Sequence, residues 1–418
     1  MSGSRGGALR ALRTRNYRLF FLGQVLSVIG TWTQNTALAW ILLQEGDELG
    51  FGLIVALQFT PLLVLGAWAG AIADRSDKPR MLQRTNALAA MVALVMAVTV
   101  SSGHRSLPVL AALVLLGGCA AAFETPTRQS MAAELVPPPD LPSAVGLNGA
   151  IMTSSRLVGS ALAGVLISTV GAEVCLYLNA VSFLAVVVAM TAIRREELQP
   201  RRRAAPSKGQ IRLGLRYAAR EPEVRLPLTA MAVIGTLALN QQVTTPLLAR
   251  QTFHAGPTLF AAFGVISGAG ALAGALTAAG RRQARAAHIG QSALLFGVAA
   301  IGVSVAPGPT SAMVLLAVTS FGASQYVAAT NSRLQAVADP AFRARVIALY
   351  AILFLGSTPI GSLIVSAISA VSSPRVAIGM GGAATVITGA VQWTIANRRA
   401  RAAPSPADQP TPGPAHAA

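Results

Sequence analysis

Long apolar runs separated by short polar segments fill almost the whole chain. A transmembrane α-helix needs about 20 consecutive, mostly apolar residues to cross the bilayer core. The pattern therefore predicts an all-α membrane protein with twelve transmembrane helices. The predicted helices span residues 19–43, 51–73, 81–100, 107–125, 141–170, 174–193, 224–248, 259–279, 286–305, 311–329, 346–370 and 376–395.

Short matches recur in the same order in the first six and the last six runs. The matching pairs are Ile29-Gly30-Thr31 with Ile234-Gly235-Thr236, Asn35 with Asn240, Gly70 with Gly274, and Gly159-Ser160 with Gly361-Ser362. Tandem halves of this kind are typical of transporters, which hold the substrate path at the junction of the repeats. We predict an N-terminal half at 19–193 and a C-terminal half at 223–397. The remaining parts are an N-terminal segment at 1–18, a linker at 194–222 and a disordered tail at 398–418.

The positive charges indicate the topology. Lys and Arg number 33 against 15 acidic residues, which gives a net charge of +18. If the N-terminus is cytoplasmic, all the Lys and Arg residues lie on the cytoplasmic side except Arg105, Arg250, Arg375 and Arg156. Cytoplasmic loops carry this excess in membrane proteins. We predict a multi-pass protein of the cell membrane with both termini cytoplasmic, and nucleic acid is not needed to explain the charge.

Composition excludes most other classes. Only 11% of the residues are charged and 53% are hydrophobic, whereas soluble domains carry about 25% charged residues. The two cysteines, Cys119 and Cys175, lie inside apolar runs and offer neither a disulfide framework nor metal-ligand spacing. The chain has no phosphate-binding loop and no nucleophile–base cluster. We predict no enzyme activity, no cofactor and no metal.

A charged loop joins the second and third runs. It contains Gly70, Asp74, Arg75, Lys78 and Arg80. Asp74 could face the positive N-terminus of a neighbouring helix, while the cations lie at the lipid headgroups. The alternative is that these cations only set the topology.

This loop resembles the hallmark loop of the major facilitator superfamily, Gly-x-x-x-Asp-Arg-x-Gly-Arg-Arg. It departs from that pattern at Asp77 and Pro79. In that family the loop holds the inward gate shut. Segments 15–20, 123–129, 156–164 and 342–346 resemble one exporter branch, which includes enterobactin exporters and macrolide-efflux proteins. The resemblance covers residues 13–397.

The resemblance implies a proton-coupled exporter that works by alternating access. The high content of Leu, Ala and Gly predicts a small amphipathic organic substrate, such as a drug, siderophore or secreted metabolite, and we expect a monomer. Two departures from the family pattern weaken the prediction of proton antiport. The family motif in the fifth helix has Gly-Pro, but this chain has Gly159-Ser160, followed by Gly164. The second gate loop has Ala278, Ala279 and Gly280 before Arg281, without an acid. An uptake carrier or uniporter, or a membrane sensor that uses the linker, stays as an alternative.

Two charged residues inside predicted helices stand out, one acid and one cation near mid-bilayer. Glu124 precedes Arg128 by one turn near the cytoplasmic end of the fourth helix. We favour a role as a gate relay, in which this pair connects the gate loop to the helices. The alternatives are that Glu124 carries protons or that the two residues only form an ion pair at the end of the helix. Arg156 lies near mid-bilayer, where a cation costs at least ~2.5–3.5 kcal/mol. It should therefore line a wet cavity and meet an anionic or carbonyl group, or else brace the helices through backbone carbonyls. Asn148 lies on the same helical face.

Polar stripes on three further helices should face the protein interior, because lipid offers them no hydrogen bonds. We predict that they line the substrate path, and hydrogen bonding between helices is the alternative. These residues are Gln24, Thr31 and Asn35 on the first helix, Thr236 and Asn240 on the seventh, and Tyr350, Phe354 and Ser357 on the eleventh.

Overall fold

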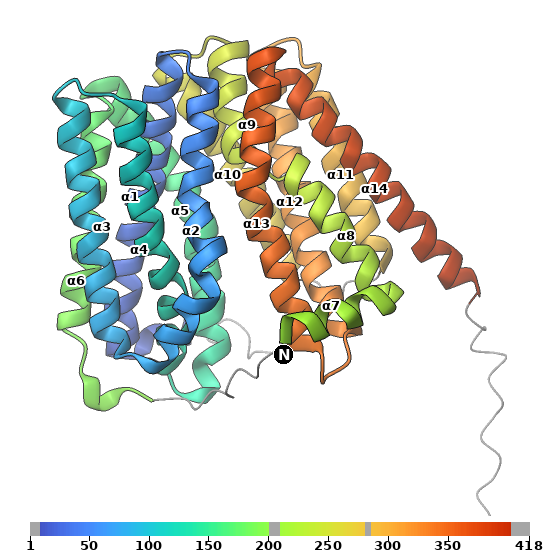
Figure 1. Ribbon diagram of the computed structural model, residues 1–418, viewed down its shortest axis with the longest axis horizontal. Helices are drawn as coiled ribbons and strands as arrows, with labels where there is room; N and C mark the ends of the chain where they lie inside the picture. Colours follow the sequence, from blue (N-terminus) through green and yellow to red (C-terminus); the bar gives the residue numbers. More distant parts are fainter. Residues whose placement is uncertain (1–8, 200–209, 281–285, 403–418) are drawn as a thin grey trace, which may run out of the picture.

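The computed structural model describes residues 9–199, 210–280 and 286–402, and its regular elements in these ranges are helices (Figure 1). Our predictions for residues 1–8, for 200–209 of the linker, for Arg281 and for 403–418 of the tail lie outside the described residues. The α-helices are α1 (Arg15–Gln44), α2 (Glu48–Arg75), α3 (Lys78–Ser101), α4 (Leu107–Glu134), α5 (Leu141–Thr169), α6 (Glu173–Thr191), α7 (Gln210–Arg220), α8 (Pro222–Leu237), α9 (Gln241–Leu247), α10 (Pro257–Ala279), α11 (Ala286–Ser304), α12 (Pro309–Val337), α13 (Arg343–Val371) and α14 (Pro374–Ala402).

Eleven helical segments of the described chain are long and apolar enough to cross a membrane, and Pro222–Thr252 counts as one of them. Helix α1 is 30 residues long but is less apolar, because Gln24, Gln34 and Asn35 interrupt it. It packs inside the bundle against α5 and α6. With α1 the predicted twelve spans are accounted for. Helix α7 is short and lies at the end of the bundle where α1 begins (Figure 1).

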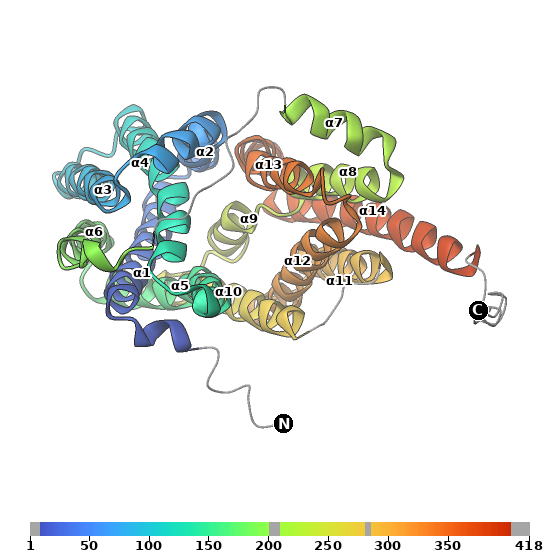
Figure 2. The ribbon, with the colours of Figure 1, turned by 90° about the horizontal axis from the view of Figure 1, so that it is seen from below.

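The two halves repeat one packing pattern. In the N-terminal half α1 packs on α5 and α6, α2 packs on α4, and α3 packs on α4 and α6. In the C-terminal half α8 packs on α13 and α14, α10 packs on α12, and α11 packs on α12 and α14. The halves meet at two helix pairs, α2 with α13 and α5 with α10. In Figure 2 each pair joins one helix of the N-terminal half to one helix of the C-terminal half across the junction.

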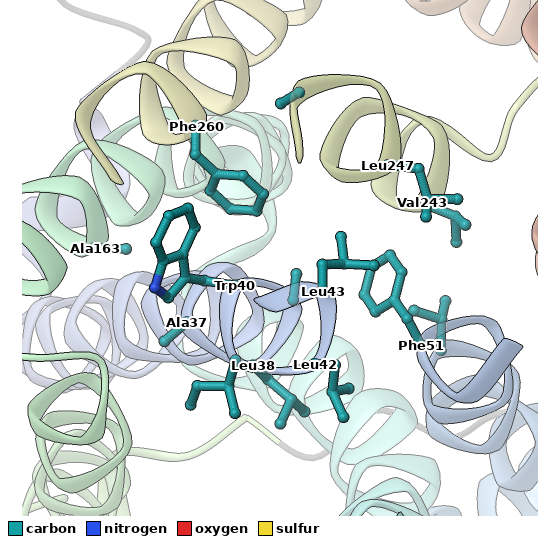
Figure 3. Close-up of a cluster of buried hydrophobic side chains, with 14 of the residues drawn as sticks. Ala37, Leu38, Trp40, Leu42, Leu43, Phe51, Ala163, Val243, Leu247 and Phe260 are labelled. Carbon is teal, nitrogen blue, oxygen red and sulfur yellow. The ribbon is translucent and has the colours of Figure 1, made fainter. Parts of the chain in front are cut away.

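The halves are sealed together at one end. We call the end where α1 begins the basic end, and the end where α1 finishes the opposite end. The largest apolar cluster joins Leu43 and Phe51 of the N-terminal half to Val243, Leu247 and Phe260 of the C-terminal half (Figure 3). The two other apolar clusters of the described residues each stay within one half and lie toward the basic end. Apolar packing thus closes the opposite end.

The seventh span is not the single helix 224–248 that the sequence predicts. Helix α8 ends at Leu237, α9 begins at Gln241, and a π-helix (Leu248–Thr252) follows directly. The break is stabilised by Asn240, whose Nδ2 donates to the carbonyl oxygens of Thr236 (2.7 Å) and Gly235 (3.3 Å). A side chain thus satisfies carbonyls that the break would leave without a helical partner.

The fourth span is longer than the predicted 107–125. Helix α4 continues through Pro126 to Glu134. Proline removes one helical donor, and the turn is supported by Thr127, whose Oγ1 donates to the Phe123 carbonyl oxygen at 2.7 Å. Glu124 therefore lies well inside α4 and not near its end.

Candidate functional site

A cavity lies between the two halves, against the sealed opposite end. In this conformation the cavity is narrow: about 70 Å³ is open to water-sized molecules, and about 700 Å³ is counted when all the space out to the solvent at its mouth is included. Helices α1, α2 and α5 line it from the N-terminal half, and α9 and α10 line it from the C-terminal half. The lining residues are Trp32, Asn35, Thr36, Leu38, Ala39, Phe51, Ile54, Val55, Gln58, Arg156, Ser160, Gln241, Gln242, Thr245, Pro246, Phe260 and Gly264.

Arg156 lies in the wall of this cavity. Its Nη2 donates to Ser267 Oγ on α10 at 3.1 Å, so the contact crosses between the halves. Its guanidinium carbon lies 5.4 Å from the centre of the Trp32 ring, which is within cation–π range. Within the described ranges, no acidic side chain forms an ion pair with Arg156. The cation is held by a hydroxyl and an aromatic face.

Ser267 continues a buried polar chain in the C-terminal half. Its Oγ lies 3.0 Å from Ser320 Oγ, and Ser320 Oγ donates to Gln241 Oε1 at 3.0 Å. Ser267 and Ser320 are fully buried, and Gln241 is 8% exposed. Gln241 Nε2 and Thr245 Oγ1 are buried and have no hydrogen-bond partner in the described structure. The chain brings together α5, α9, α10 and α12, which are far apart in the sequence.

The motif of the fifth helix lies where α5 contacts its neighbours. A Cβ atom on Gly159 would lie 2.6 Å from Trp32 Cβ, so this glycine lets α5 approach α1. Ser160 lies against Gly264, and Gly164 faces Ala261, both on α10. These small residues therefore build the seam between the halves directly beside Arg156.

Glu124 and Arg128 form an ion pair on α4, with Arg128 Nε 3.1 Å from Glu124 Oε1. Arg128 also donates from Nη1 to Asn148 Oδ1 at 2.8 Å, and its Nη2 lies 3.9 Å from Met152 Sδ. The Arg128 side chain is 8% exposed. The pair connects α4 to α5 on the basic side of Arg156, and it does not line the cavity.

The gate loop lies at the basic end. Asp77 caps α3 by accepting from the Arg80 amide at 3.0 Å, and it also accepts from Arg195 at 2.8 Å. Lys78 forms a buried ion pair with Glu134, at the end of α4. Asp74 and Arg75 are exposed. At Gly70 a Cβ atom would meet only Pro126, at 4.0 Å.

One of the stripe residues lines the cavity, and the others are buried or partly buried elsewhere in the bundle. Asn35 lines the cavity and its Oδ1 accepts from Gln58 Nε2 at 3.3 Å. The other stripe residues lie outside the lining. On the first and seventh spans, Gln24 is buried, Thr31 and Thr236 donate to the carbonyl oxygens of Ser27 and Ala232 in their own helices, and Asn240 stabilises the break before α9. On α13, Tyr350 donates to the Val327 carbonyl oxygen and stacks on Phe354, and Ser357 donates to the Phe354 carbonyl oxygen. Their assignment to the path stays a prediction.

The sequence did not single out several polar lining residues. Gln58, Gln241 and Gln242 are amides inside or beside predicted apolar runs, and that position was an available signal. Ser267 and Ser320, which are buried behind the lining, gave no signal, because small hydroxyl residues are common in transmembrane helices and bond to their own backbone.

Comparisons with solved structures identify the architecture. A bacterial homologue of the human lysosomal transporter Spinster, in an inward-facing and occupied conformation, aligns with a TM-score of 0.70 and 15% identity over 97% of this chain and all of that chain. The peptide transporter POT aligns with a TM-score of 0.71 and 17% identity over 93% of this chain and 95% of that chain. At this identity the likeness shows the fold.

Sequence relatives are transporters too. The staphyloferrin A transporter of Staphylococcus aureus is 29% identical over 173 residues, and the match spans 41% of this chain and 44% of the relative. The MFS-type transporter YfiS of Bacillus subtilis is 26% identical over 309 residues, or 71% of this chain and 72% of the relative. The profile of the transmembrane secretion effector family matches residues 6–417. This chain therefore belongs to the transmembrane secretion effector family of the major facilitator superfamily, and it is a multi-pass membrane transporter and not an enzyme.

Proposed function

We propose that this protein is a secondary active exporter that moves a small amphipathic organic molecule out of the cell by alternating access. One observation carries the proposal: a cavity at the junction of two repeated halves, sealed at one end by packing between them. In repeat transporters the substrate binds at this junction, and the halves rock around it.

The charge distribution supports the orientation of the protein in the membrane. The described residues Arg75, Lys78, Arg80, Arg333 and Arg345 lie at the basic end, and such an excess marks the cytoplasmic side. The sealed opposite end would then face outward, and the cavity would load from the cytoplasm. The termini would both be cytoplasmic.

The comparisons support the kind of substrate. The name of the family refers to secretion, and one relative is named for transport of staphyloferrin A. Drugs, siderophores and secreted metabolites remain the expected classes. Trp32, Phe51 and Phe260 would contact the apolar part of such a molecule, while amide and hydroxyl groups would orient its polar part.

Protons are the expected coupling ion. Among the described residues Glu124 is an acid inside a membrane-spanning helix, and it is paired with the buried Arg128. An uptake carrier or uniporter on the same fold is the second candidate. The observation that favours it is Ser160, whose hydroxyl lies 3.4 Å from Thr36 Oγ1 at the place where the exporter motif has proline.

Two experiments test the proposal in sequence. Cells lacking their own efflux pumps, with and without this protein, are screened for survival and dye retention against a panel of amphipathic compounds. Compounds whose retention falls are then followed in inside-out vesicles with an imposed pH difference. An exporter accumulates them only when the vesicle interior is acidic. Equal movement without the pH difference would exclude proton antiport and favour the uniporter.

A further inference from the structure

The charge of the cavity is one-sided. Arg156 is the single ionisable side chain among the described lining residues. The guanidinium is effectively always protonated. Its hydrogen-bond partner in the described chain is the neutral Ser267 hydroxyl, and its face lies on the Trp32 ring. The cavity therefore has one positive charge that no described protein group neutralises.

The cavity also holds a buried hydrogen-bond donor that lacks an acceptor. Arg156 donates to Ser267, and Ser320 donates to Gln241 Oε1. Because the oxygen of the Gln241 amide is thus occupied, its nitrogen is the group left to bond. Gln241 Nε2 is buried without a partner in the described structure. A buried donor without an acceptor is costly, so the site favours a ligand that brings one.

A second buried polar group without a described hydrogen-bond partner lies one turn further along α9. Thr245 is 4% exposed, its Oγ1 has no described partner, and it lines the same cavity. Residues four apart share a helix face, so Gln241 and Thr245 present two neutral donors from the C-terminal half. Arg156 presents its cation from the N-terminal half.

We propose that this site binds the carboxylate of an amphipathic organic acid between Arg156 and the pair Gln241 and Thr245. The proposal rests on the exporter function, since it names the class of molecule carried. A guanidinium fork matches a carboxylate in geometry, and the two neutral donors serve its remaining lone pairs. A single cation balances a monoanion and would leave a phosphate dianion under-compensated. Trp32, Phe51 and Phe260 receive the apolar body.

Binding of the acid is compatible with the contact between the halves. A guanidinium has five N–H donors, and one of them, on Nη2, reaches Ser267. The carboxylate can therefore use the remaining donors while Arg156 still links α5 to α10, at the seam where Gly164 meets Ala261.

The test measures binding to the purified full-length protein in lipid nanodiscs by equilibrium dialysis. The probes are naphthaleneacetate and phenylbutyrate, each with its neutral amide and with an amine of the same skeleton. We expect the wild type to bind the acids about tenfold more tightly than the amides, as charge-assisted hydrogen bonds require, and to reject the amines. Arg156→Gln should abolish this preference and leave binding of the amides unchanged.

Two further variants keep the test independent of folding. Gln241→Leu and Thr245→Val remove the orphan donors with little change of shape and should each reduce the preference for acids by several-fold. Arg105→Gln removes the same charge from the opposite end, where it pairs with Glu173, and should behave as wild type. Equal or tighter binding of amides or amines by the wild type, no binding of any acid, or a preference that survives Arg156→Gln would each overturn the proposal.

The same probes in inside-out vesicles separate this proposal from the exporter function. Export of amines or neutral amides in place of acids would refute the acid site and leave the exporter standing. Binding that prefers acids without any transport would refute the exporter and leave the site.

Discussion

Gly159 on α5 and Gly361 on α13 occupy equivalent places in the two halves, and each lets its helix touch the first span of its own half. A Cβ atom on Gly159 would lie 2.6 Å from Trp32 Cβ on α1. A Cβ atom on Gly361 would overlap the Thr236 carbonyl and the Asn240 amide group at the α8 break. This shared contact gives a physical reason for the repeated glycine in the sequence.

Alanine at either glycine should destabilise the protein. Gly159→Ala and Gly361→Ala force the helices apart, and overpacking of this kind costs about 1–3 kcal/mol. Gly146→Ala is the matched control, because a Cβ atom there meets nothing within 4 Å and alanine favours a helix over glycine. Thermal unfolding in detergent, followed by tryptophan fluorescence, should rank Gly146→Ala at or above wild type. A Gly159→Ala melting temperature equal to that of Gly146→Ala would refute this account.

Shortening an apolar side chain in the cluster that seals the opposite end should shift the protein toward a state that is open there. Leu247 is fully buried between the halves and lies near Leu43 and Phe51 in Figure 3. Leu247→Ala should cost the sealed state about 2 kcal/mol or more, while a state with the halves apart there loses less. Spin labels at Ser106→Cys and Ser372→Cys, in a background with Cys119→Ala and Cys175→Ala, report the separation by pulsed electron paramagnetic resonance.

We expect Leu247→Ala to add a population with a longer distance between the labels. Leu82→Ala is the control, since Leu82 is equally buried but packs inside the N-terminal half. If both variants change the distances alike, the cluster at the opposite end is not the seal.

The sequence predicted the fold well because lipid imposes a simple rule on it. Each span must bury its backbone in a helix of sufficient length, so the apolar runs locate the helices. The same rule forces a mid-bilayer cation to face the protein interior. Arg156 was therefore recognisable before its surroundings were known, and Asn35 on α1 was recognisable for the same reason.

The rest of the site depends on packing that no local pattern encodes. Ser267 and Ser320 meet because α10 packs on α12, and neither residue stands out within its own helix. Gln241 becomes a cavity residue because α8 breaks before it, whereas the apolar run 224–248 predicts one continuous helix. The signal for the break is Asn240, whose side chain replaces helical hydrogen bonds, and the sequence alone assigns that residue equally well to the path.

The Lys78–Glu134 pair should contribute to stability only as a pair. Its side chains are 13% and 10% exposed, so removal of one partner leaves a charge that is poorly solvated. Lys78→Met and Glu134→Gln should each lower the free energy of unfolding by about 2 kcal/mol, somewhat less than for a fully buried pair. The double variant should lose clearly less than the sum of the two. Additive losses in urea unfolding would show that the charges act independently.

Glu124→Gln distinguishes the roles open to the acid of α4. Glu124 holds Arg128, which also bonds Asn148 on α5, so the charge ties two helices of the N-terminal half together on the basic side of the cavity. If the pair relays the state of the gate, it acts in every transport cycle. We then expect Glu124→Gln to slow two rates in inside-out vesicles, substrate exchange at equal pH and uphill export. Each rate should fall about tenfold, which corresponds to about 1.4 kcal/mol on the barrier.

Glu197→Gln is the matched control, because Glu197 pairs with Arg194 on the exposed surface and its loss should change neither rate. Exchange that stays at the wild-type rate while uphill export is lost would identify Glu124 as the proton carrier, since exchange of loaded carriers needs no proton movement. Two unchanged rates would reduce the pair to a local ion pair on α4. The ratio of the two rates, measured in one vesicle preparation, therefore assigns the residue.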